Sequence, residues 1–431
     1  MTARRALVTL AQWLGLGAVV GVGCGAASAL FLALLDAATS TRQHHEWIVF
    51  GLPLAGLALG ALYARFGASI WGGTNLVIDT IHDGGPAIPL RMFPMVLAGT
   101  VVTHLFGGSA GREGTAVQMG AIIADHVAHR CRLAGRLRQQ LIVAGVAGGF
   151  GAVFGTPIAG TVFGLEVVVL GRIRSDAFVP ALVAAIVGDL TTRALGIGHT
   201  PYPAVLHAPL TPSLCLAWLA FAAVLALVIV VFIELTQFLR RQAERHIPTL
   251  ALRMAIGGAI IVVLWQLLGT SAYLGLGIPT IVQAFREPGV VEWAFAAKLG
   301  FTAITLAAGF IGGEVTPLFF IGAALGSVLA PVLGIPRELG AGVGMAAAFA
   351  IASNTPLALS VMAVELLGAA VLPHVVIVCV LAYLMTGQRS IYPAQRVTRG
   401  KGGGTPAAPV PLRAVRARPP PPPARDPPAS E

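Results

Sequence analysis

Long apolar stretches recur along almost the whole chain and are separated by short polar segments. Eleven stretches predict membrane helices, at about residues 6–35, 48–66, 91–106, 139–170, 177–195, 213–238, 250–270, 295–312, 316–334, 340–366 and 368–385. Many of them reach the roughly 20 apolar residues that a spanning helix needs. The pattern therefore predicts an all-α, polytopic membrane protein that extends to about residue 395.

The first apolar stretch follows the basic segment Met1 to Arg5, as the core of a signal peptide would. Its apolar run is about twice as long as the core of a secretory signal peptide. We therefore expect a retained membrane helix.

The composition is that of a membrane protein, and the positions of the arginines explain the net positive charge. The 431 residues are 56% hydrophobic and only 11% charged, whereas soluble domains have roughly 25% charged residues. The net charge is +10, but the arginines cluster between apolar stretches, as the positive-inside rule expects of cytoplasmic loops. We therefore expect no nucleic-acid partner. The clusters are Arg4 and Arg5, residues 130–138, Arg172 with Arg174, residues 240–245, and the region from Arg389 onward.

The cysteines show neither the spacing of a metal site nor that of a disulfide framework. They are far apart and lie mostly in apolar stretches, so we expect small side chains buried in the membrane, with no metal and no cofactor. They are Cys24, Cys131, Cys215 and Cys379.

The last residues differ in kind from the rest of the chain. Residues 397–431 are rich in Gly, Pro and Arg and end in RPPPPPARDPPASE. Such a composition is typical of disordered or polyproline segments, so we expect a disordered cytoplasmic tail.

An internal repeat divides the apolar part of the chain. TPIAGTVFGLE at Thr156 resembles TPLALSVMAVE at Thr355, 199 residues later, and each segment ends in a glutamate, Glu166 or Glu365. GREGTAVQMGA and GGEVTPLFFIGA share Glu-x-Thr at almost the same separation, with Glu113 and Glu314 201 residues apart. We predict a first transmembrane repeat at 1–205 and a second at 206–396, as in repeat transporters with a site at the membrane midplane.

Two glycine-containing loops precede apolar segments of the repeat. FGGSAGREGT and GFIGGEVTP each place glycine and a polar side chain directly before a new apolar run. Such sequences suit helix starts. A helix that starts inside the membrane presents free N–H groups and a positive dipole end, which is a site for a dehydrated anion.

Acidic residues mark the same segments. The chain has only 18 acidic residues, and Glu113, Glu166, Glu314 and Glu365 lie within or at the ends of apolar runs. Ionisable groups in a membrane are costly and indicate function, and a buried carboxylate can carry a proton. A glutamate beside an anion site predicts coupled exchange of an anion and protons. For Glu166 and Glu365, structural carboxylates at helix ends are an equally good interpretation.

One motif has a competing interpretation. GGSAG at 107–111 matches the nucleophile elbow of serine hydrolases, and His104 is close by. That motif indicates a nucleophile only on a strand-to-helix turn in an α/β sheet, and no such sheet is predicted here. An intramembrane serine hydrolase is therefore a distant alternative.

These motifs resemble those of the CLC family of chloride channels and proton-coupled anion exchangers. GREGT at 111–115 resembles the family's GREGP signature, GEVTP at 313–317 occupies the place of GxFxP, and GTNLV at 73–77 occupies that of GSGIP. Tyr392 in SIYPAQ matches a late tyrosine whose hydroxyl contacts the anion. The resemblance covers residues 1 to about 396 and implies an inverted repeat with broken and re-entrant helices.

The departures from the family's signatures are also informative. Thr115 replaces a proline, Val315 replaces a phenylalanine, and Val167 replaces the second of two successive glutamates. The serine of GSGIP is absent. GREGT, GGEVTP and an asparagine-containing first loop together resemble the fluoride-exporting branch of the family.

The resemblance implies a secondary transporter, not an enzyme, that exports fluoride in exchange for protons. A chloride/proton exchanger or a passive chloride channel of the same fold remains the alternative. The resemblance also implies a homodimer in the bilayer of the inner or plasma membrane, with one pathway per subunit.

Individual roles follow from the matched motifs. Glu113 is implied to be the gating glutamate that carries the proton and occupies an anion site, and Tyr392 to close the anion path. The remaining candidates are Thr316, Glu314 and Val315 for the central anion site, Asn75 or Thr74 for the inner one, and the flanking Gly111, Arg112, Gly114, Thr115, Gly313 and Pro317.

Overall fold

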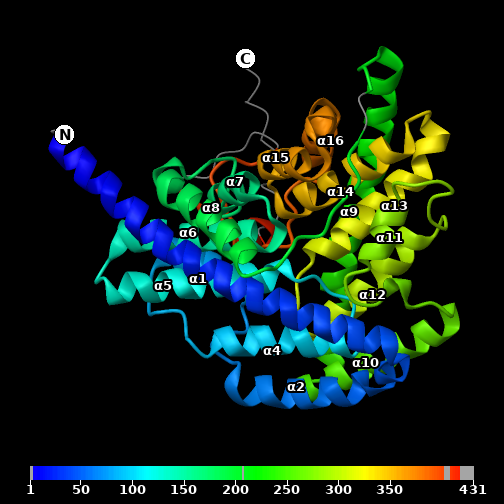
Figure 1. The fold of residues 1–431 in the computed structure, drawn as a ribbon. Coiled ribbons are helices and arrows are strands. Elements are labelled where there is room, and N and C mark those ends of the chain that lie inside the picture. Colours follow the sequence, from blue (N-terminus) through cyan, green and yellow to red (C-terminus); the bar gives the residue numbers. More distant parts are fainter. Residues whose placement is uncertain (1–2, 206–207, 402–407, 418–431) are drawn as a thin grey trace, which may run out of the picture.

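The computed structural model describes residues 3–205, 208–401 and 408–417 and is almost entirely helical. Figure 1 shows helices of very different lengths that cross one another in several directions. Among the described residues, seven helices are long and apolar enough to cross a membrane. The prediction of an all-α, polytopic membrane protein is confirmed.

Eight α-helices belong to the predicted first repeat and nine follow it. The first eight are α1 Ala3–His44, α2 Leu52–Phe66, α3 Thr74–Asp83, α4 Met92–Leu105, α5 Glu113–Arg130, α6 Gly135–Phe154, α7 Pro157–Glu166 and α8 Phe178–Ala194. The others are α9 Pro212–His246, α10 Leu250–Leu268, α11 Ile278–Gln283, α12 Ala294–Ala308, α13 Val315–Leu333, α14 Arg337–Ser353, α15 Pro356–Leu367, α16 Leu372–Met385 and α17 Leu412–Ala417. The 3₁₀ turns are Glu46–Gly51, Ser175–Ala177, Ser271–Tyr273 and Ala369–Val371.

Two predicted single helices are in fact broken. The stretch 139–170 divides into α6 and α7 at Gly155, and 340–366 divides into α14 and α15 at Asn354. Both residues are left-handed, with φ of 74° and 58°, and this conformation ends a helix. A Thr-Pro pair follows each break, and proline suits the first position of a new helix.

The two predicted repeats contain matching close contacts between helices. In the first, Gly120 of α5 lies against Gly145 of α6; in the second, Gly322 of α13 lies against Gly344 of α14. A Cβ atom on any of these glycines would overlap with the backbone of its partner. Small residues let membrane helices approach this closely. The equivalent positions support the repeat, whereas its boundaries at 1–205 and 206–396 stay a prediction.

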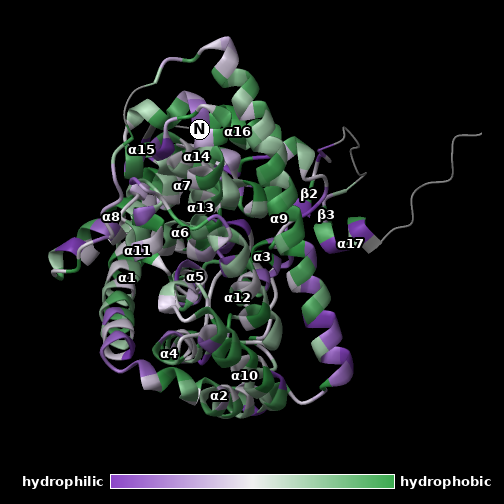
Figure 2. Ribbon diagram, turned by 90° about the vertical axis from the view of Figure 1, so that its right-hand side faces the viewer, coloured by the Kyte–Doolittle hydropathy of each residue, from purple (hydrophilic) through white to green (hydrophobic). Residues whose placement is uncertain are grey.

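Part of the predicted disordered tail is ordered. Three short strands, β1 Val169–Leu170, β2 Arg396–Val397 and β3 Val410–Pro411, form a sheet in the order β1-β2-β3, parallel and then antiparallel. Helix α17 follows β3, and Figure 2 shows β2, β3 and α17 beside α9, on the side of the bundle away from α1. The prediction of disorder was wrong for 397–401 and 408–417, because Val397 of β2 and Leu412 of α17 are buried with Leu170 in a small apolar cluster. The rest of the proline-rich region, 402–407 and 418–431, lies outside the described residues.

The cysteine prediction holds for two of the four residues. Cys24 and Cys379 are buried, and all four are free thiols. Cys131 and Cys215 are exposed, because one directly follows α5 and the other lies on the first turns of α9.

Candidate functional site

Two helix starts from the two halves of the chain meet inside the molecule. The backbones of Gly111 and Gly313 form an antiparallel bridge, with N···O distances of 2.6 and 2.8 Å. Helix α5 begins two residues after Gly111 and α13 begins two residues after Gly313. Gly114 also lies close to the bridge, because a Cβ atom there would be 3.3 Å from the Cα of Gly313. The bridge thus holds the N-termini of α5 and α13 together.

The carboxylate of Glu113 is bound at the N-terminus of α13. It accepts hydrogen bonds from the hydroxyl and from the backbone N–H of Thr316, the latter at 3.3 Å. The backbone N–H of Arg112 donates a further hydrogen bond at 3.0 Å. Glu113 is fully buried, so a carboxylate occupies the position where the free N–H groups of a helix favour an anion.

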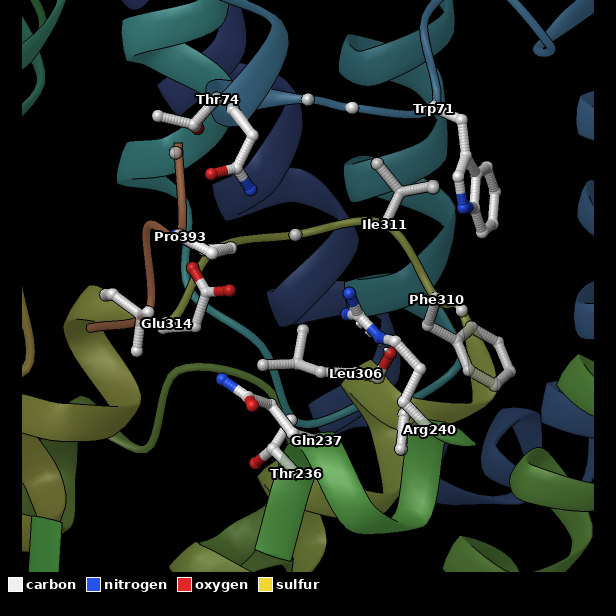
Figure 3. Close-up of a pocket in the computed structure, with 18 of the residues that line it drawn as sticks. Trp71, Thr74, Thr236, Gln237, Arg240, Leu306, Phe310, Ile311, Glu314 and Pro393 are labelled. Carbon is white, nitrogen blue, oxygen red and sulfur yellow. Dashed lines mark hydrogen bonds between the residues drawn. The ribbon is translucent and has the colours of Figure 1, made fainter. Parts of the chain in front are cut away.

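A cavity of about 520 Å³ leads toward this place. It is lined by residues of α3, α5, α9 and α12, by the loop before α13 and by the loop before β2, including Asn75, Gly114, Glu314 and Tyr392. Figure 3 shows the side chain of Glu314 approaching it from the loop before α13 and that of Arg240 approaching it from α9. The cavity therefore brings four predicted anion-path residues, Thr74, Asn75, Glu314 and Tyr392, together with Arg240.

The first turn of α3 presents hydrogen-bond donors to the cavity. The side-chain oxygen of Asn75 accepts from the N–H of Ala394 at 3.1 Å, so its NH₂ group is the part left to donate. Thr74 accepts from the amide of Gln118 at 3.2 Å, which leaves its hydroxyl hydrogen able to donate. Both residues line the cavity.

Tyr392 is held by its backbone while its hydroxyl makes no hydrogen bond to the described residues. Its N–H donates to Ser390 at 2.9 Å, and the side chain lines the cavity with only 4% of its surface exposed. Gln395 supports the loop through hydrogen bonds to Ser390 and Asn354, at 2.7 and 3.1 Å. The hydroxyl of Tyr392 is therefore a donor without a protein acceptor.

Other motif residues lie around the site without lining the cavity. Thr115 shares a hydrogen bond of 2.6 Å with Thr100, and Val315 and Pro317 are buried in the first turn of α13. Arg112 lies 3.7 Å from the carboxylate of Glu113 and donates to Thr200 at 3.3 Å. Val315 thus contributes a helix start, not a side chain in the cavity.

Gln118 and Arg240 are two of the residues at the cavity that were not among the predicted candidates. Gln118 lies on α5 five residues after Glu113 and orients Thr74. Arg240 lies on α9 and donates to the carbonyl of Leu306 at 3.4 Å. A glutamine in an apolar helix was a usable signal, whereas Arg240 looked like an ordinary member of a basic loop.

Glu166 and Glu365 have reciprocal structural contacts. Glu166, at the end of α7, accepts from the N–H groups of Leu357 and Ala358 at 3.2 and 2.8 Å. Glu365, on α15, accepts from Ile158 and Ala159 at 3.0 and 2.7 Å. Each carboxylate therefore accepts hydrogen bonds from the free N–H groups at the start of the helix that carries the other glutamate. These contacts agree with the interpretation of both residues as structural carboxylates.

The residues of the hydrolase motif are not arranged for nucleophilic catalysis. Both ring nitrogens of His104 hydrogen-bond to backbone carbonyls, of Thr100 and Ala110, at 2.8 and 2.9 Å. Ser109 shares a hydrogen bond with Thr302 at 3.0 Å. His104 therefore cannot act as the base for Ser109 in this arrangement.

Comparisons with known proteins agree with the geometry. Residues 55–387 match the model of the family described as voltage gated chloride channel. The chloride/fluoride channel protein of Pseudomonas syringae pv. tomato is 47% identical over 398 residues, which are 91% of this chain and 88% of the relative. The H(+)/Cl(-) exchange transporter ClcA of Vibrio parahaemolyticus is 25% identical, over 81% of each chain.

Solved structures show the same fold. The crystal structure of a CLC-type fluoride/proton antiporter aligns with a TM-score of 0.87 and 37% identity, over 92% of this chain and all of the other. A slow cyanobacterial Cl⁻/H⁺ antiporter aligns with a TM-score of 0.77 at 18% identity, which supports the fold alone. The chain therefore belongs to the CLC family of anion channels and anion/proton exchangers.

Proposed function

We propose that this protein is a fluoride/proton antiporter that exports fluoride from the cytoplasm. The observation that carries the proposal is the position of Glu113, whose carboxylate holds the N-terminus of α13 through the N–H and hydroxyl of Thr316. The same donors suit an anion. A single site that binds either the carboxylate of Glu113 or the transported anion links movement of that anion to the protonation of Glu113.

The exchange follows from charge and hydrogen bonding. As a carboxylate, Glu113 accepts from the helix start and excludes an anion. Once protonated, it has lost its negative charge and has an O–H to donate, so an anion can replace it on the N–H groups and hydroxyl of the first turn. Return of the deprotonated side chain expels the anion, and one cycle moves the anion and the proton in opposite directions.

The donors along the path favour fluoride. Fluoride is small, and its dehydration requires strong hydrogen-bond donors. The hydroxyl of Tyr392 and the amide of Asn75 are available in the cavity, and the hydroxyl of Thr316 lies beyond it. Glu314 also lines the cavity and becomes a donor when it is protonated. The names of the 47% identical relative and of the 37% identical antiporter both include fluoride.

A chloride/proton exchanger is the second candidate, and a passive channel of the same fold is the third. The relative from Vibrio parahaemolyticus is named an H(+)/Cl(-) exchanger. Against chloride stands Glu314 on the cavity wall, since its protonated carboxyl is a further hydrogen-bond donor, which chloride uses less well than the stronger acceptor fluoride.

The direction of transport rests on the basic residues of α9. Arg240 and Arg241 lie near the end of α9 and line the cavity, and basic residues at a helix end favour the cytoplasmic side. We propose that the cavity opens to the cytoplasm of a cell whose inner or plasma membrane holds the protein as a homodimer. Cross-linking in membranes tests the dimer.

Efflux from proteoliposomes tests the substrate. Liposomes loaded with fluoride or with chloride, at equal concentration, are diluted into anion-free buffer while an anion electrode and a pH electrode record both fluxes. We expect rapid fluoride release with proton uptake and far slower chloride release. Equal rates for the two anions would refute the selectivity, and fluoride release without proton movement would indicate a channel.

A further inference from the structure

The C-terminal helix α17 lies against the loop that carries Tyr392. The N–H groups of Leu412 and Arg413 donate to the carbonyls of Gln395 and Pro393 at 2.8 and 2.9 Å. The side chain of Leu412 is buried. Backbone hydrogen bonds and apolar contacts thus fix α17 next to the cavity, on a segment that the composition marks as a disordered tail.

Two arginines of α17 belong to the wall of the cavity. Arg413 and Arg416 both line it. Arg413 makes two hydrogen bonds to Asp79 of α3, at 3.1 and 3.2 Å, and Arg416 makes one to Glu234 of α9, at 2.6 Å. Helix α17 therefore connects the two helices that stand on either side of the entrance.

These ion pairs change the charge of the α3 side. Asp79 and the exposed Asp83 both pair with Arg396, at 3.0 and 2.6 Å. Without Arg413, one arginine would face two carboxylates, and this side would have a net negative charge. Both carboxylates lie on α3, the helix that also carries Thr74 and Asn75. With Arg413 added, the two charges of each sign balance.

The α9 side changes in the same direction. Glu234 pairs with Arg389 at 2.8 Å as well as with Arg416, so the second arginine makes this side net positive. Arg240 and Arg241, farther along α9, have no carboxylate within 4 Å among the described residues and line the cavity. The cavity is lined by five arginines and two glutamates, and an entrance with an excess of one sign of charge raises the local concentration of the opposite ion.

We propose that α17 is a working part of the anion entrance, in which Arg413 and Arg416 are positioning residues that cancel the acids of α3 and α9 and promote capture of cytoplasmic fluoride. This inference rests on the proposed function and on the cavity facing the cytoplasm. It assigns a role in transport to a segment outside the two membrane repeats.

The test uses the full-length chain in inverted membrane vesicles, whose outer face is the cytoplasmic one. The initial rate of proton-coupled fluoride uptake, at varied fluoride, gives KM and kcat at that face. For Arg413→Gln with Arg416→Gln we expect a KM about threefold higher or more, with kcat unchanged and a smaller difference at high salt, because surface charge is screened over about 8 Å at physiological ionic strength. The matched control is Arg130→Gln with Arg132→Gln, two exposed arginines outside the cavity, which should leave KM unchanged.

Restoring the charge separates an electrostatic role from a merely structural one. Adding Asp79→Asn and Glu234→Gln to the double arginine variant removes the two acids, so we expect KM to return toward the wild-type value. Arg413→Gln alone, should the double variant fold poorly, is expected to give about half of the effect on the free-energy scale. An unchanged KM in the arginine variants, an equal change in the control, or no recovery after removal of the acids would overturn the proposal.

A wrong role for α17 and a wrong proposed function give different results in this experiment. If wild-type vesicles take up chloride and not fluoride, the proposed substrate is wrong, and the same comparison of KM values is made with chloride. If fluoride is transported and the arginine variants match wild type, only the role of α17 is wrong.

Discussion

Glu113 and Thr316 are 203 residues apart in the sequence, yet the carboxylate of Glu113 accepts hydrogen bonds from both the N–H and the hydroxyl of Thr316. The contact joins the first turns of α5 and α13, one from each half of the chain. It places the only carboxylate of GREGT where an anion would be bound.

Glu113→Gln removes the group that can exchange a proton while keeping its size. We expect proton uptake during fluoride efflux to fall to the level of empty liposomes, because an amide does not titrate in this range. Fluoride efflux itself should be slow or uncoupled. Glu287→Gln makes the same chemical change at a side chain that is 76% exposed and should transport normally. Proton coupling that survives in Glu113→Gln would remove this residue from its role.

Thr316→Val removes the hydroxyl donor and keeps the shape of the side chain. A hydrogen bond to a charged group contributes about 1.5–3 kcal/mol, so we expect the KM for fluoride to rise about tenfold or more. Thr316→Ser retains the hydroxyl and should remain close to wild type. Equal KM values for the valine and serine variants would show that the hydroxyl does not bind the anion.

Tyr392→Phe removes a hydroxyl that makes no hydrogen bond to the described residues. Unfolding temperature in detergent should therefore stay within experimental error, while the KM for fluoride rises, because the anion alone loses a partner. A fall in unfolding temperature with unchanged KM would assign the hydroxyl a structural role instead.

Glu365→Gln weakens a structural contact and leaves the anion path intact. The carboxylate accepts from two N–H groups of α7, and an amide can present only one acceptor oxygen to them. We expect the free energy of unfolding to fall by about 1–3 kcal/mol. The measured effect is a lower temperature at which heating removes the monodisperse peak in gel filtration. Transport per folded molecule should be retained. Loss of proton coupling at full stability would make Glu365 a proton carrier.

Much of the fold and site could be predicted because the signals are local. Apolar length identified most membrane helices, and the Glu-x-Thr repeat identified the two helix starts that meet at Gly111 and Gly313. The breaks at Gly155 and Asn354 were missed because apolar composition is the same on both sides of a left-handed residue. Helix α3 was missed because its sequence contains many polar residues, and only the start of α5 was predicted.

Other features could not be predicted, because they depend on contacts between distant segments. The basic residues of α9 resemble those of any cytoplasmic loop, and only the folded chain places Arg240 at the cavity. Leu412 lies in a short segment of prolines, arginines and small apolar residues, so its burial against Leu170 and Val397 could not be predicted from composition. The reciprocal contacts of Glu166 and Glu365 likewise require both halves of the fold.

The central claim is that fluoride and protons are exchanged through one shared site, and uphill pumping tests it most directly. Proteoliposomes loaded with fluoride, at equal pH inside and outside and with the membrane potential set to zero, are diluted into fluoride-free buffer while the internal pH is recorded. We expect the outward fluoride gradient to drive protons inward, so that the interior becomes acidic without any initial proton gradient. Fluoride loss at constant internal pH would contradict it.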